Sequence, residues 1–150
     1  MAAQTSAGRA AGGFLAGAVS VLVFHQGAWA ILHAVGLMPP PFPVAPVPPF
    51  GVPRIYDLCF WGGLYGAVFG LLAPLLPARG VWIQGLVLGL IAELGAMYLV
   101  PAIKGLPFAF GGSVRVIEIS SVINGTWGIG VGLISPLLVG RGRAARLRSA

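Results

Sequence analysis

Charged residues are scarce in this sequence. They make up 8% of the 150 residues, and only three are acidic, whereas a soluble domain carries about 25% charged residues. A surface with so few charges is not suited to water, which excludes an ordinary soluble protein. The length also excludes two domains. Although the net charge is +6, no basic patch alternates with aromatic residues, so we do not expect nucleic acid as a partner.

Cysteine and catalytic motifs are equally sparse. Cys59 is the single cysteine, so no disulfide can form within the chain. There is no HExxH motif, no Walker loop and no nucleophile accompanied by a base. His25 and His33 are separated by about 12 Å along a helix, which is too far for one shared metal ion. We therefore expect no enzyme, no metal and no cofactor, with a haem protein kept as a remote alternative.

Long apolar stretches, by contrast, are abundant. A membrane span needs about 20 apolar residues, and the stretches that qualify are 12–37, 58–76, 81–100 and 116–139. We predict an all-α fold, a four-transmembrane-helix bundle in a single domain 1–150. A signal peptide cleaved after Ala30 is the alternative for the first stretch, but its apolar character continues beyond that point.

The basic residues predict the orientation of these spans. With both ends in the cytoplasm, the inner side holds Arg9, Arg79 and the four arginines of the tail 140–150. The outer side then holds fewer basic residues, namely Arg54, Lys104 and Arg115. Because basic loops stay on the cytoplasmic side, we expect a multi-pass protein of a bacterial inner membrane whose tail contacts anionic lipids.

The predicted connections differ in character. The outer loop 38–57 contains eight prolines and should be semi-rigid. We interpret it as a stiff connector, with a docking surface as the alternative. The inner turn 77–80 is short, which predicts that the second and third spans are antiparallel neighbours.

The sequence also contains an internal similarity. Residues 70–80 and 132–142 agree at seven of eleven positions. A weaker match relates the first span to the third and aligns His25 with Glu93. We interpret the chain as two similar hairpins, a parallel internal repeat with a pseudo-twofold axis along the membrane normal.

Glycine is abundant within the spans and recurs on single helix faces. Because lipid provides no hydrophobic drive for helix association, small residues that allow close backbone approach are expected at helix contacts. A pore lining is the minority alternative. The glycines of these stripes are Gly62, Gly66, Gly70, Gly85, Gly89, Gly125, Gly128 and Gly132.

Polar residues within the spans are few. A carboxylate at the depth of Glu93 must be paired, protonated or hydrated, and the repeat predicts that His25 faces it. Ser120, Ser121 and Asn124 lie at similar depth in the fourth span. This cluster is interpreted as interhelical glue, with a proton relay or a small-ligand site as the alternative.

Two charged pairs stand at the outer ends of spans, Arg54 with Asp57 and Arg115 with Glu118. Each pair has a spacing of three residues, so its members can meet on one helix surface. We expect them to fix the depth of the span ends. Ligand binding at the outer mouth is the alternative.

Three strings, His25–Trp29, Pro48–Pro53 and Phe60–Gly63, together with four spans, resemble a group of small uncharacterised bacterial inner-membrane proteins. The resemblance implies a location and no activity. Our prediction is a non-enzymatic protein that acts by assembly, as a homo-oligomer or as an accessory subunit of a larger complex in the lipid bilayer. The alternative is a small transporter or proton-conducting channel that uses His25 and Glu93.

Overall fold

A computed structural model describes residues 4–77 and 79–139 and is all-helical apart from a two-residue ladder. The basic tail 140–150, which we predicted to lie on the cytoplasmic side and to contact anionic lipids, is outside the described residues. The elements in chain order are α1 (Ser6–Ser20), η1 (Val21–His25), α2 (Gln26–Ala34), β1 (Pro46–Val47), β2 (Val52–Pro53), α3 (Arg54–Leu72), η2 (Ala73–Leu75), α4 (Val81–Leu94), η3 (Gly95–Leu99), α5 (Val100–Lys104), η4 (Phe108–Gly112) and α6 (Val114–Leu138).

Four continuous helices are long and apolar enough to cross a membrane, as the sequence predicted: Ser6–Ala34, Arg54–Leu75, Val81–Lys104 and Val114–Leu138. The first and third each contain one wider π-helical segment, η1 and η3. Several helix ends extend into polar residues that hydropathy alone leaves out. Thr5 caps the first helix by accepting a hydrogen bond from the Gly8 N–H at 3.1 Å, so the helix begins before the apolar stretch.

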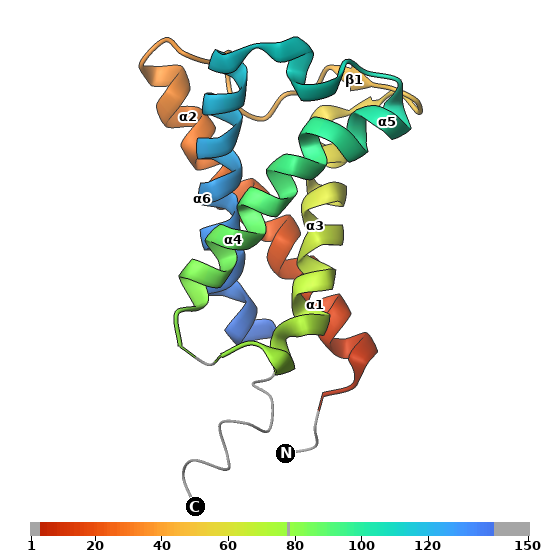
Figure 1. Cartoon of the computed structure of the whole chain (residues 1–150), viewed down its shortest axis with the longest axis vertical. Coiled ribbons are helices and arrows are strands. Elements are labelled where there is room, and N and C mark those ends of the chain that lie inside the picture. Colours follow the sequence, from red (N-terminus) through yellow and green to blue (C-terminus); the bar gives the residue numbers. More distant parts are fainter. Residues whose placement is uncertain (1–3, 78, 140–150) are drawn as a thin grey trace, which may run out of the picture.

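The described chain begins and ends at the same end of the bundle (Figure 1). The side chain of Gln4 donates to the Leu138 carbonyl at 3.2 Å across these two segments. We call this the terminal end, and it also holds the connection 73–80. The opposite end, the loop end, carries the two longer connections, 35–53 and 105–113.

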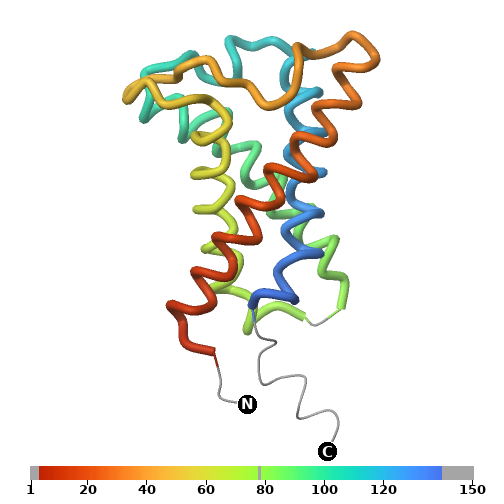
Figure 2. The backbone as a smooth tube through the Cα atoms, turned by 180° about the vertical axis from the view of Figure 1, so that it is seen from behind, coloured from red at the N-terminus to blue at the C-terminus, as the bar shows by residue number. Residues whose placement is uncertain are grey.

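The helices pack as two pairs. α1 packs along α3, α4 packs along α6, and α1 also crosses α6 and joins the pairs (Figure 2). α3 and α4 run antiparallel, as predicted for the second and third spans, but they scarcely touch and are not packing neighbours. The reason is that the glycine face of each helix is already occupied, by α1 in the case of α3 and by α6 in the case of α4.

A compact apolar core lies in the middle of the bundle. Its buried members come from all four spans: Val21, Phe69, Leu88, Ala92, Trp127 and Val131. Within α3, α4 and α6, Phe69, Leu88 and Val131 lie on the terminal-end side of the residues described below. The other core members, Val21, Ala92 and Trp127, also line the cavity described below.

Candidate functional site

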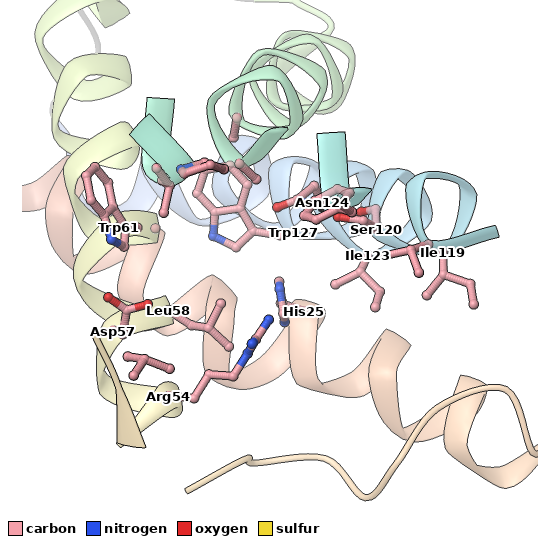
Figure 3. Close-up of a pocket in the computed structure, with 18 of the residues that line it drawn as sticks. His25, Arg54, Asp57, Leu58, Trp61, Ile119, Ser120, Ile123, Asn124 and Trp127 are labelled. Atoms are coloured by element: carbon pink, nitrogen blue, oxygen red, sulfur yellow. Dashed lines mark hydrogen bonds between the residues drawn. The ribbon is translucent and has the colours of Figure 1, made fainter. Parts of the chain in front are cut away.

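A partly open cavity of about 750 Å³ lies above this core, in the loop-end half. Its size falls within the range of about 300–1,000 Å³ that is typical of ligand pockets. All four spans line it, and Val47 and Pro48 of the Pro-rich loop and Phe110 of the second connection border it. Figure 3 shows side chains from η1, α3 and α6 converging on the space. We call it the loop-end cavity.

Tryptophans anchored by hydrogen bonds form part of its wall. Trp127 is 2% exposed, and its Nε1 donates to the Gly17 carbonyl at 3.0 Å, which joins α6 to α1. Trp29 Nε1 donates to the Pro39 carbonyl at 2.8 Å, and Trp61 lines the cavity from α3. With their polar atoms satisfied, Trp127 and Trp29 present apolar ring surface to the cavity.

The Pro-rich loop is tied to the helices around the cavity. Its Pro43 and Ala45 carbonyls accept the backbone N–H groups of Ile55 and Arg54, the first residues of α3, at 2.9 and 3.0 Å. These bonds satisfy N–H groups that have no partner within a helix. Together with the Trp29 bond, they hold the loop in place beside the cavity.

A short chain of hydrogen bonds determines which ring nitrogen of His25 carries the proton. His25 is 6% exposed. The Phe42 N–H donates to Gln26 Oε1 at 2.6 Å, so this oxygen is the acceptor end of the amide. Gln26 Nε2 is therefore the donor to His25 Nδ1 at 3.2 Å. Since Nδ1 accepts, the proton of the neutral ring sits on Nε2. His25 projects into the cavity with an N–H to donate (Figure 3).

Arg54, at the first turn of α3, extends into the same space toward His25 (Figure 3). Within residues 4–77 and 79–139 its guanidinium has no hydrogen-bond or ion-pair partner. Asp57, the partner that we expected, instead accepts two bonds from Lys104 Nζ at 2.6 Å each. The predicted Arg54–Asp57 pair is thus wrong, because the Asp57 carboxylate is already paired with Lys104 at the end of α5.

The second predicted pair does not form either. Arg115 and Glu118 are both exposed near the start of α6, and no salt bridge joins them in the described part of the chain. Arg115 borders the loop-end cavity. Spacing rules missed the role of Lys104 as the partner of Asp57, because the two residues lie 47 positions apart.

Glu93 is bound by α6. It is 3% exposed, and its Oε2 accepts from Ser120 Oγ at 2.8 Å and from Asn124 Nδ2 at 2.6 Å. Oε1 is buried without a hydrogen-bond partner. Ser121, the other serine in the expected cluster, makes no hydrogen bond to Glu93. Ser120 and Asn124 also line the cavity, which connects this cluster to it.

His25 and Glu93 do not bond to each other, and the predicted direct pair is absent from the described residues. The reason is the helix register. Gly13 lies against Gly66 as Gly85 lies against Gly128. Glu93 follows Gly85 by eight residues, and the residue eight after Gly13 is Val21, about one turn before His25.

The stripe glycines lie at helix contacts. A Cβ on Gly62, Gly66 or Gly70 would meet atoms of the first span, including backbone at each of the three positions. In the other pair, a Cβ on Gly85, Gly89, Gly128 or Gly132 would strike the backbone of the facing helix. Gly125 is less crowded and faces only the Leu86 side chain, at 3.3 Å.

The remaining candidates have local partners. His33 Nδ1 bonds to the Met38 carbonyl at 2.9 Å, and Cys59 is half-buried in α3. Within residues 4–77 and 79–139, no group of three or more His, Cys, Asp or Glu is placed to hold a metal ion. No family model, curated protein or solved structure matches the chain, so its resemblance to small four-span bacterial proteins stays a prediction.

Proposed function

We propose that this multi-pass protein binds a small amphipathic ligand inside the loop-end cavity, without catalysing a reaction on it. The observation that carries the proposal is the cavity itself, a space of about 750 Å³ between four helices that are long and apolar enough to cross a membrane. Its wall combines anchored tryptophans with a few converging donors, the composition expected of a ligand site.

The ligand enters and leaves from the loop-end half. Toward the terminal end lies a layer of buried apolar side chains, Phe69, Leu88 and Val131. A proton moving from Glu93 toward the terminal end would have to cross this apolar layer. His25 does not extend the path, because it is not hydrogen-bonded to Glu93. The geometry thus supports one-sided binding better than a proton-conducting channel.

Assembly, our first expectation from the sequence, remains a second proposal with weaker support. The glycine stripes that suggested it are used within the chain, where α1 covers the stripe of α3 and α6 covers that of α4. No glycine face of these stripes is thereby left over for a second copy. Assembly with a partner would need other lipid-facing surfaces.

The binding proposal is tested by narrowing the cavity. Ala96 borders it and is half-buried, so Ala96→Phe places a ring inside, whereas Ala102→Phe adds the same ring at an exposed position. A panel of neutral and anionic single-chain amphiphiles is titrated in maltoside micelles while thermal unfolding is followed. We expect saturable stabilisation of about 2.7 kcal/mol at a hundredfold excess over Kd.

Ala96→Phe should lose this stabilisation, and Ala102→Phe should keep it. If no amphiphile stabilises the unaltered protein, or if Ala96→Phe responds equally, ligand binding in the cavity is wrong.

The location and the symmetry are also proposals. Arg9 and Arg79 lie at the terminal end, and the sequence holds four further arginines after residue 139, against three basic residues at the loop end. This bias in the sequence supports a cytoplasmic position for the terminal end in a bacterial inner membrane. The two glycine-packed pairs, α1 with α3 and α4 with α6, support a duplicated hairpin. The α1–α6 contact has only a weak counterpart between α3 and α4, so the two halves are related imperfectly.

The orientation is tested by cysteine labelling in a Cys59→Ala background. Phe50→Cys, at a loop residue that is 87% exposed, should react with an impermeant maleimide in intact spheroplasts. Ser6→Cys, at the terminal end, should react only after the membrane is opened. The reverse pattern would place the termini outside.

A further inference from the structure

We infer that the ligand of the loop-end cavity is an amphipathic anion, a single apolar chain whose carboxylate or phosphate head binds Arg54 and His25. The inference rests on the proposed function and names the chemistry of the ligand. It follows from the donors that meet inside the cavity and from the lack of acceptors for them.

The first donor is the Arg54 guanidinium. It carries a permanent charge and five N–H groups in a fork that matches two oxygens of a carboxylate or phosphate. Asp57, one turn along α3, is occupied by Lys104 at 2.6 Å. An arginine at a membrane surface ordinarily extends toward the headgroups, but this side chain extends into the cavity (Figure 3).

The second donor is His25 Nε2–H. Gln26 donates to Nδ1, and Gln26 is in turn held by the Phe42 N–H, so the backbone of the Pro-rich loop determines which ring nitrogen carries the proton. Nε2 has no hydrogen-bond partner among the described residues. Arg54 and His25 are therefore two adjacent donors that lack an acceptor, and an oxyanion supplies one.

The net charge of the cavity lining is positive, which also favours an anionic ligand. Arg54 and Arg115 are cationic and unpaired in the described chain, while Lys104 and Asp57 neutralise each other. Glu93 is not among the lining residues and lies behind Ser120 and Asn124, which line the cavity and donate to its carboxylate. The lining thus carries two uncompensated positive charges, which attract an anion and oppose a cation.

The rest of the wall selects an apolar body. Trp61, Trp127 and Leu58 face the space near Arg54 and His25 (Figure 3), and Ile119 and Ile123 add further apolar lining from α6. Inorganic phosphate would leave these surfaces uncovered. Burial of apolar area on binding contributes about 25 cal/mol per Å², so a chain-bearing anion gains much more than its head alone.

The test compares heads on one chain. The unaltered protein in maltoside micelles is titrated with palmitate, hexadecyl phosphate and hexadecanol, and with acetate and inorganic phosphate, while tryptophan fluorescence and thermal unfolding are recorded. We expect both anionic amphiphiles to bind at least about tenfold more tightly than hexadecanol, and the free anions to bind more weakly still. The tighter of the two anionic amphiphiles identifies the head as carboxylate or phosphate.

Two variants connect the preference to its residues. Arg54→Gln should reduce the preference for the anion to less than about threefold, and Arg54→Lys should restore part of it. Arg79→Gln makes the same charge change at the exposed terminal end and should leave the preference intact. His25→Phe keeps a ring but removes the N–H, so it should lower the affinity for the anion. This variant provides an independent test if Arg54→Gln does not fold.

Equal binding of hexadecanol and the anions, or an unchanged preference in Arg54→Gln, overturns the inference and leaves ligand binding in place. Inorganic phosphate binding as tightly as hexadecyl phosphate also overturns it, because the site would then recognise a simple anion. Failure of every amphiphile overturns the inference and the proposed function together.

Discussion

Lys104 donates to both carboxylate oxygens of Asp57 at 2.6 Å, so the tips of α5 and α3 are joined by an ion pair at the loop end. The two side chains are 6% and 16% exposed, respectively. α3 and α4, the longer helices that lead to this pair, scarcely touch each other. The pair therefore links these two helices at the loop-end cavity, which both residues line.

Removal of one member of this pair should be costly. Lys104→Met leaves the Asp57 carboxylate largely buried and uncompensated, which should lower the free energy of unfolding by about 3 kcal/mol. The double variant Asp57→Leu/Lys104→Met should recover most of that loss, since no charge is left behind. Unfolding in mixed micelles measures both, with Arg115→Met as an exposed control. A double variant as unstable as Lys104→Met would contradict this account.

Because α4 and α6 are in close contact, the effect of a Gly→Ala substitution on stability should depend strongly on its position. A Cβ on Gly85 would strike the backbone carbonyl of Gly128, whereas a Cβ on Gly27 has nothing within 4 Å. Gly85→Ala should therefore cost about 1–3 kcal/mol through overpacking. Gly27→Ala should gain up to about 1 kcal/mol from helix propensity. Thermal unfolding compares them, and equal stability would show that the helices separate freely.

The bonds of Glu93 predict an order among its substitutions. Glu93→Gln keeps an oxygen to accept from Ser120 and Asn124, while Glu93→Leu removes the acceptor and leaves their donors buried. The loss for leucine should be about 1–3 kcal/mol and larger than that for glutamine. Glu118→Leu, at an exposed position of α6, provides the control. If leucine is tolerated better than glutamine, the cluster does not act as interhelical glue.

Much of the helical framework could be predicted from the sequence. Apolar stretches of about 20 residues separated by proline, glycine and charge are enough to place four long helices. Their ends were placed less well: α3 begins at Arg54 because the carbonyls of Pro43 and Ala45 accept its first N–H groups, and hydropathy contains no information about such bonds.

The candidate site was predicted only in part. Glu93, Ser120 and Asn124 were grouped correctly because a buried carboxylate needs donors and the fourth span offers them at that depth. His25 was assigned the wrong partner, since the match between the first and third spans was taken one helical turn out of register. Arg54 and Asp57 share a helix face, yet Asp57 pairs with Lys104, 47 positions away, and not with Arg54.

The sequence by itself determined that this chain forms four apolar helices, because hydrophobicity and length act locally along the chain. It also determined that glycine faces would mediate close approach. Only the tertiary structure decided which faces meet. α1 covers α3, α6 covers α4, and the unequal contacts between the two pairs leave a cavity where Arg54 lies beside His25. Helix pairing depends on backbone fit between distant segments, and that fit exists only after the chain has folded.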